Sequence, residues 1–354
     1  MQFCRRMGKK WIWAALALVV MAILLKLWMV PCWYSSNDKN VLLKYDAPIS
    51  NSEFDSLIEQ KTGLSTPISV AKVAVWRGLN LSAAGTTSLV IRPKTSLWSL
   101  IKLLVRYQRE QKMVTIHSHW DYNQFLKQLS SQFNWSATEL GEEMMDPTNH
   151  KRWNQQTWLS KKGLDSYNWQ AMAIPNSYLF KSDSKPAAVL DRLVSEAHDF
   201  WTKDRMLAAK DLGLSPVEVV VLASIVTKES NHIPEYGKIA ATYKNRLKIN
   251  MLLQADPTVV FARGKAGRVL LSDTKIESPY NTYLHKGLPI GALCIPSTNA
   301  IDSCLFGAGY PYLYFCAKSD LTPQHDFAVT LSEHNKNAQR YHRALNEYQR
   351  NKRR

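Results

Sequence analysis

One carboxyl group in the sequence has the surroundings that acid catalysis needs. Ser215, Pro216 and Glu218 predict the start of a helix, because Ser215 can cap free backbone amides and Glu218 can complete a capping box. The helix that follows is apolar and ends on Glu229. At about 100° per residue, Glu229 shares one face with three apolar residues, Leu222, Ile225 and Val226.

This position predicts a raised pKa for the Glu229 carboxyl. Burial disfavours the charged form of a carboxyl, and the negative end of the helix dipole acts in the same direction. A carboxyl that stays protonated near neutral pH can donate a proton as a general acid. The helix pattern alone leaves a second interpretation open, in which Glu229 frays into solvent at the helix end.

Polar side chains downstream indicate a binding surface. Gln254, Asp256 and Thr258 alternate in L-Q-A-D-P-T, and Pro257 biases Asp256 toward an extended conformation. On an extended chain the three side chains share one face, where they could bind the hydroxyl and N-acetyl groups of a sugar. A polar turn whose groups bond one another is the alternative.

Further candidate binding residues lie on later loops and on the last helix. The S-P-Y-N-T-Y loop brings two aromatic rings and an amide together, and Gly287–Gly291 is a Gly/Pro turn whose backbone could approach a ligand. The further candidates for substrate binding are Tyr280, Asn281, Tyr283, His325 and Asn335.

The elements that must position these residues predict a mixed α+β domain. An apolar stripe from Leu190 to Trp201 predicts a long helix before the one that carries Glu229, and a second stripe predicts a helix over 236–248. Residues 312–315 have the composition of a strand, and a final helix follows. A polar, turn-rich stretch places a domain boundary near His150, so we assign the catalytic domain to residues 151–354.

The preceding region, residues 31–150, alternates strand-like and helix-like segments. Strands are expected near Val41, Ser88 and Val114, each followed by a helical stripe. This order resembles LysM-like modules, which bind amino-sugar polymers. A small α/β spacer without a ligand fits the pattern equally well.

The N-terminus has the pattern of a single membrane anchor. A basic cluster within residues 1–10 precedes an apolar run over residues 11–30, and 20 helical residues span about 30 Å. The basic cluster predicts a cytoplasmic N-terminus and a periplasmic catalytic domain, held to the inner membrane by one transmembrane helix. A cleaved signal peptide is the alternative, but the sequence around residues 28–32 lacks the small residues of a cleavage site.

Charge and cysteine content narrow the classes of partner. The formal net charge of +16 favours anionic surfaces or polymers, and without a nucleic-acid-binding motif we expect no nucleic-acid partner. The five cysteines form no CxxC pair, and no motif indicates a metal or another cofactor. We expect Cys294, Cys304 and Cys316 to be buried free thiols, with a disulfide among them as the alternative.

Several motifs occur together in the order found in one family. They are L-A-S-I-V-T-K-E-S, N-R-L, L-Q-A-D-P-T, S-P-Y-N-T-Y, G-L-P-I-G, Y-L-Y-F, H-x-F and H-N. On these motifs the chain from about residue 172 to residue 348 resembles the YceG-like (MltG) family of membrane-anchored endolytic murein transglycosylases, and is similar to its Bacteroidetes-type members.

The resemblance implies an activity and a catalytic residue. The family cleaves peptidoglycan glycan strands between N-acetylmuramoyl and N-acetylglucosamine residues and leaves 1,6-anhydro ends, without metal or cofactor. Its catalytic glutamate is the second one of an E-K-E-T motif, which corresponds to Glu229; the first corresponds to Thr227, a departure. Thr227 points about 160° away from Glu229 on the helix, so we expect activity to be retained.

The resemblance also implies partners, and two other functions stay open. The family implies peptidoglycan synthases as partners and termination of glycan elongation as a role. One alternative is an ordinary muramidase that uses Glu229 and Asp256 as a carboxyl pair. The other is a membrane-tethered peptidoglycan-binding scaffold without activity.

Overall fold

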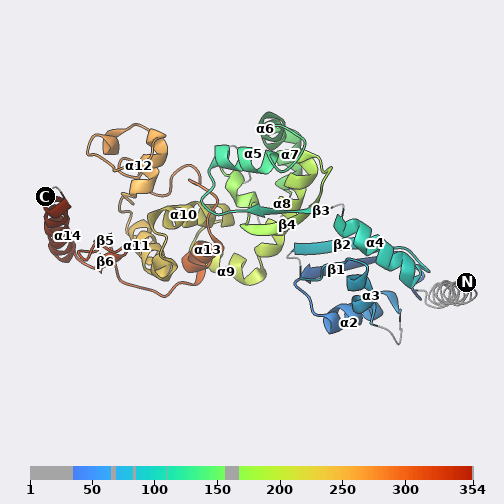
Figure 1. Ribbon diagram of the computed structural model, residues 1–354. Helices are drawn as coiled ribbons and strands as arrows, with labels where there is room; N and C mark the ends of the chain where they lie inside the picture. Colours follow the sequence, from blue (N-terminus) through green and yellow to red (C-terminus); the bar gives the residue numbers. More distant parts are fainter. Residues whose placement is uncertain (1–34, 65–68, 83–84, 110, 156–166, 353–354) are drawn as a thin grey trace, which may run out of the picture. The chain divides into compact units, whose positions relative to one another are not determined.

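The computed structural model describes residues 35–64, 69–82, 85–109, 111–155 and 167–352. These residues form a mixed α+β fold of many helices and small two-stranded sheets (Figure 1). The expected membrane anchor at residues 11–30 lies outside the described residues. Within the described part of the chain, no helix combines the length and the apolar character needed to cross a bilayer.

The chain divides into two compact units, Met1–Val114 with Ser177–Ser182, and Thr115–Asn176 with Asp183–Arg354. The first unit has a β-α-α-β-α order. Its elements are β1 (Val41–Ala47), α2 (Asn51–Thr62), α3 (Val70–Trp76), β2 (Gly85–Ile91) and α4 (Leu97–Arg109). β1 and β2 pair antiparallel, and they share one hydrophobic core with the three helices. The strands expected near Val41 and Ser88 are thus confirmed.

The chain crosses between the two units near residue 114 and again around residues 176–183, and the catalytic domain assigned to residues 151–354 stays a prediction. Strand β3 (Gln111–Ile116) pairs with β4 (Asn176–Lys181), and the chain passes into the second unit at Val114. The helices that follow are α5 (Tyr122–Ser130), α6 (Ala137–Met145), α7 (Pro147–Trp153) and α8 (Pro186–Phe200). The α5, α6 and α7 helices belong with the second unit because α6 and α7 pack on α8. Asp191 of α8, for example, accepts hydrogen bonds from Arg152 and Trp153 of α7.

Helix α10 (Pro216–Glu229) is the centre of the second unit. The helices that contact it are α9 (Lys203–Asp211), α11 (Tyr236–Lys248), α12 (Asp256–Arg263) and α13 (Thr298–Phe306), with the short helix η2 (Trp169–Met172). Every residue from Val219 to Thr227 is buried, so the helix has no exposed side before its last turn. The sequence indicated one buried face; the surrounding helices cover all faces, as expected for a helix that is apolar all round.

Two polar side chains inside α10 fix the chain segment that follows the G-L-P-I-G turn. Ser224 Oγ accepts a hydrogen bond from the Leu293 amide at 3.0 Å, and Thr227 Oγ1 accepts one from the Ser297 amide at 3.1 Å. These bonds satisfy backbone groups that would otherwise be buried without partners. The polar side chains inside α10 therefore hold a neighbouring chain segment in place. The last turn of the helix reaches the surface.

The C-terminal part of the second unit is a hairpin and a long helix. Strands β5 (Tyr314–Ala317) and β6 (His325–Ala328) pair antiparallel, and α14 (Leu331–Lys352) packs against both. The short helices η3 (Ile233–Glu235) and η4 (Asp273–Lys275) complete the second unit. The helix predicted over 236–248 and the strand predicted near 312–315 are confirmed as α11 and β5.

The capping box of α10 offers a test of local stability. Ser215 Oγ accepts a hydrogen bond from the Glu218 amide at 3.3 Å, and Glu218 Oε2 accepts one from the Ser215 amide at 2.9 Å. We expect Ser215→Ala to lower the free energy of unfolding by about 1 kcal/mol, because the first amides of the helix lose an acceptor. Urea unfolding followed by tryptophan fluorescence measures the loss. Ser215→Asp keeps an acceptor and is the matched control, so equal midpoints for both variants would contradict the prediction.

Candidate active site

Glu229 lies in the last turn of α10, where the buried helix reaches the surface. Its side chain is half-buried. The hydroxyl of Tyr243, on α11, donates a short hydrogen bond to Glu229 Oε1. Tyr243 itself is almost fully buried, and its ring packs edge-on against Phe315 of β5 at 5.8 Å between centroids. One carboxylate oxygen is thus fixed by a buried donor, which leaves Oε2 to carry a proton.

The surroundings of Glu229 raise its pKa to about 7. Burial is the largest cause, because it disfavours the charged carboxylate. The hydrogen bond from Tyr243 acts against burial and lowers the pKa, the negative charge of Asp256 raises it, and the positive charge of Arg246 lowers it. The raised pKa predicted from sequence therefore agrees with the structure, and the carboxyl is partly protonated at neutral pH.

Asp256 stands close to this carboxyl but in a different local structure from the one expected. It is exposed and is the first residue of α12, with Pro257 in the first turn, a position that suits proline. The expectation that residues 254–258 form an extended chain with three side chains on one face is therefore wrong. Tyr283 donates a hydrogen bond to Asp256 Oδ1 at 2.6 Å, so these two predicted residues do lie together. Gln254 is exposed, with a backbone φ of 48°.

Thr258 and Asn281 are buried and bonded within the protein. The Thr258 hydroxyl donates to the Ala255 carbonyl at 2.7 Å and lies 2.9 Å from the Thr282 hydroxyl. The Asn281 amide donates to the carbonyls of Thr274 and Ile276. Neither side chain lines the cleft beside Glu229, so the structure places both as supports of the binding loops rather than as ligand contacts.

The remaining predicted residues, Tyr280, His325 and Asn335, are not among those that line the cleft with Glu229. His325 Nδ1 lies 2.9 Å from Glu235 Oε2, so the imidazole and the carboxylate join β6 to η3. Asn335 is exposed on α14. The ring of Tyr280 packs at a tilt against Phe261, with 4.5 Å between ring centroids, and lines a small pocket of about 280 Å³. The other residues lining this pocket are Tyr122, Met145, Trp169, Gln170 and Phe261.

Glu229 and Asp256 line a cleft of about 1120 Å³. Its walls come from the last turn of α10, the start of α5, helix α12 with the loop at 264–269, and α14. Helix α14 contributes Tyr341, Leu345 and Gln349. The volume slightly exceeds that of a typical small-molecule pocket, which suits an extended ligand.

Two residues of the N-R-L motif hold the scaffold of the cleft. Asn245 donates to the carbonyls of Tyr310 and Tyr312, both at 2.8 Å. Arg246 donates to the carbonyls of Leu313 and Leu253, at 2.7 Å and 2.6 Å. Both side chains therefore tie the irregular segment before the hairpin, and the segment before α12, to helix α11.

The pattern of residues 236–248 predicted a helix but not the contact of its Tyr243 with the Glu229 carboxyl. A tyrosine on the inward face of this helix, one turn before a buried arginine, was the available signal, because a buried hydroxyl needs a hydrogen-bond partner. The Gly287–Gly291 turn also has a different role from the one expected. A Cβ at Gly291 would lie 2.2 Å from the Tyr167 carbonyl oxygen, so this glycine permits close backbone packing.

The departure at Thr227 and the cysteines have plain structural explanations. Thr227 is buried on the side of α10 that contacts Ser297, whereas Lys228 and Glu229 line the cleft. Cys294, Cys304 and Cys316 are free thiols; the first two are buried, as expected, and Cys316 is partly exposed.

The bond between Tyr243 and Glu229 predicts the direction of a pKa change. Since this hydrogen bond lowers the pKa of Glu229, Tyr243→Phe should raise that pKa further above about 7. A ¹³C NMR titration of protein labelled at glutamate carboxyls measures it, with Glu229→Gln to assign the resonance. An unchanged or lower pKa in Tyr243→Phe would contradict the assignment of this bond.

Comparison with known proteins places the chain among relatives with a shared name. An endolytic murein transglycosylase of Bacillus subtilis (strain 168) is 40% identical over 131 residues, which are 37% of this chain and 36% of the relative. An endolytic murein transglycosylase of Streptococcus pneumoniae (strain ATCC BAA-255 / R6) is 30% identical over 157 residues, which are 43% of this chain and 28% of the relative. The matched segments thus span at most 36% of these relatives.

A solved structure has the same fold. The crystal structure of a YceG-like protein from Listeria monocytogenes superposes with a TM-score of 0.55 and 23% sequence identity, over 85% of this chain and 99% of that one. The sequence model of the YceG-like family matches residues 59–340, which is most of the chain. On the extent of that match, this protein is a member of the YceG-like family.

Proposed function

We propose that this protein is an endolytic lytic transglycosylase that cleaves the glycan strands of peptidoglycan. The observation that carries the proposal is Glu229, an acid with a pKa of about 7, on a cleft of about 1120 Å³. The curated relatives are named endolytic murein transglycosylases, which supports the same substrate.

The reaction needs one carboxyl that acts first as an acid and then as a base. Protonated Glu229 gives its proton to the glycosidic oxygen between the N-acetylmuramoyl residue and the next N-acetylglucosamine, and the bond from C1 to that oxygen breaks. The 6-hydroxyl of the same N-acetylmuramoyl residue attacks C1, and its proton passes to the Glu229 carboxylate. The products are a 1,6-anhydro end and a free 4-hydroxyl, and no water is consumed.

The neighbours of Glu229 suit this double role. Tyr243 stabilises the carboxylate that forms after proton donation, while burial and Asp256 oppose it, so the two protonation states have similar free energies near neutral pH. We assign to Asp256, which accepts a hydrogen bond from Tyr283, the role of stabilising the positive charge that develops on the sugar ring.

A hydrolytic muramidase is the second candidate, because Asp256 lies close enough to raise the pKa of Glu229. In that reaction one carboxyl activates a water molecule or attacks the sugar, and the product has a free reducing end. The chemistry of the new chain end therefore separates the two reactions.

The proposal extends to the location and the first unit of the protein. A transmembrane helix at residues 11–30 would hold the catalytic domain on the periplasmic side of the inner membrane, close to newly made strands. The β-α-α-β order of the first unit supports a LysM-like role in binding amino-sugar polymers. Peptidoglycan synthases are the partners we propose, and a cut in a nascent strand would end its elongation.

Replacement of the acid tests the reaction. We expect Glu229→Gln to lower the rate of strand cleavage by at least 10²-fold, because a neutral amide cannot donate the proton. Mass spectrometry of the products made by the full chain from uncrosslinked strands measures both rate and end chemistry. Anhydro ends support the proposal. Reducing ends would indicate the muramidase, and strands left intact by both proteins would indicate a scaffold without activity.

The raised pKa predicts the pH dependence of the activity. The acid must be protonated, so kcat/KM should fall as the pH rises through about 7. Tyr243→Phe should move this fall to higher pH, because it removes the bond that lowers the pKa. The measurement is initial rate against pH for both proteins at low substrate concentration. A fall centred near pH 4.5 would contradict the raised pKa of Glu229, and the same curve for both proteins would contradict the role of the Tyr243 bond.

A further inference from the structure

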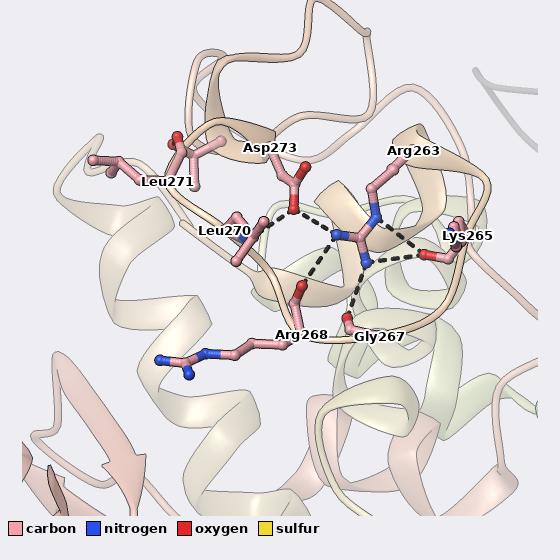
Figure 2. A network of polar contacts seen from close by, with 8 residues as sticks. Arg263, Lys265, Gly267, Arg268, Leu270, Leu271 and Asp273 are labelled. Atoms are coloured by element: carbon pink, nitrogen blue, oxygen red, sulfur yellow. Dashed lines mark hydrogen bonds and ion pairs between the residues drawn. The ribbon is translucent and has the colours of Figure 1, made fainter.

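The loop between α12 and η4 is held from inside by a single arginine. Figure 2 shows the Arg263 guanidinium enclosed by this loop, which we call the Arg263 loop and define as residues 264–273. Arg263 Nε and Nη2 donate to the Lys265 carbonyl, Nη2 also donates to Gly267, and Nη1 donates to the Arg268 carbonyl, at distances from 2.9 to 3.1 Å. Nη1 also pairs with Asp273 Oδ2.

All five N–H groups of Arg263 are therefore used within the loop. The same Asp273 oxygen accepts the Leu270 amide at 2.8 Å, which closes the far side of the loop. The side chains of Arg263 and Asp273 are only 18% and 14% exposed, so solvent competes little with these bonds. A planar guanidinium with its donors in a fixed fork holds several carbonyls at once, which makes the Arg263 loop preformed rather than induced by a ligand.

This preformed loop is one wall of the catalytic cleft. Residues 264–269 line the cleft together with Glu229 and Asp256. The backbone carbonyls of Lys265 and Arg268 face inward to Arg263, and the side chain of Arg268 extends away from that network (Figure 2). Lys265 and Arg268 are thus two cationic residues on a wall of the cleft that Glu229 also lines.

The other charged groups of the cleft already have partners. Lys228 Nζ donates to the His119 carbonyl at 2.9 Å, Asp121 caps α5, and Asp256 accepts from Tyr283. Among the described residues, by contrast, the side chains of Lys265 and Arg268 make no hydrogen bond or ion pair. An unpaired guanidinium on a cleft wall is suited to a carboxylate, which it can bind with two parallel hydrogen bonds.

The proposed substrate supplies such a carboxylate only on its peptides. The sugars of the strand are neutral when N-acetylated and when the lactyl group is joined to a peptide, whereas the peptide ends in ionised carboxyls. We propose that Arg268, positioned by Arg263 and assisted by Lys265, binds a carboxylate of the peptide carried by an N-acetylmuramoyl residue in the cleft. This inference rests on the proposed function and assigns its specificity for peptide-bearing strands.

A comparison of two substrates tests the role of Arg268. The substrates are uncrosslinked strands with intact peptides, and the same strands with the peptide carboxyls converted to amides. We expect the parent protein to prefer intact peptides and Arg268→Ala to reduce the ratio of the two kcat/KM values roughly tenfold, mainly through KM. Arg268→Lys should retain part of the preference, and Lys203→Ala, an exposed cation on α9, should retain all of it.

The outcomes separate this inference from the proposed function. If the parent makes anhydro ends on both substrates and Arg268→Ala leaves the ratio unchanged, the inference is wrong while the function stands. If the parent makes no anhydro ends, the function itself is wrong. Strands stripped of peptides carry a free lactyl carboxylate; an Arg268 effect confined to these strands would overturn the assignment to the peptides.

The positioning role of Arg263 has its own readout. Arg263→Ala should lower the same ratio, and the double variant with Arg268→Ala should lower it no further, because both act on one contact. Amide hydrogen exchange at 264–273 should speed up in Arg263→Ala and stay slow in Arg268→Ala. Arg263→Lys should resemble Arg263→Ala, since an ammonium has three donors instead of five. Additive effects of the two substitutions would overturn the positioning role.

Discussion

The site depends on one constraint, the burial of helix α10 on every side up to its last turn. Because the helix is enclosed, the residue at its end leaves the core at a fixed place and with little solvent around it. At that place burial disfavours the charged carboxylate, so the pKa of Glu229 rises to about 7. The core around α10 thus determines both the position of Glu229 and its protonation state.

The polar residues around the site follow a common rule, which is that each buried donor has a defined acceptor. Tyr243 bonds Glu229, Arg246 bonds two backbone carbonyls, and Arg263 bonds three carbonyls and a carboxylate. A buried polar group costs little free energy when all its hydrogen bonds are made, and much when one partner is removed. These bonds therefore fix the loops that form the cleft without adding charge to it, and the reactive acid meets a preformed surface.

The charge of the whole protein and the charge of the cleft have different roles. The net charge of +16 favours approach to an anionic polymer over long distances, an effect that salt screens. Within the cleft, Lys228 and Asp256 make hydrogen bonds to other protein groups. The side chains of Lys265 and Arg268, on the Arg263 loop, are the exception among the described residues. The net charge favours the approach of the proposed substrate, and the unpaired cations of the cleft select which strands bind.

Capping and periodicity are local properties of the chain, so they predicted the helix of Glu229, its capping box and the following helix from the residues alone. The raised pKa was one of two interpretations that this pattern left open. The sequence did not determine the geometry around Asp256, since a proline after it suits both an extended segment and a helix start. The folded structure was needed to show that Asp256 begins α12, that Thr258 is buried, that Tyr243 contacts Glu229 and that Arg263 fixes a wall of the cleft. The contacts of Tyr243 with Glu229 and of Tyr283 with Asp256 join different elements, and only packing brings those elements together. The contacts of Arg263 are local in sequence but follow no helix or strand periodicity.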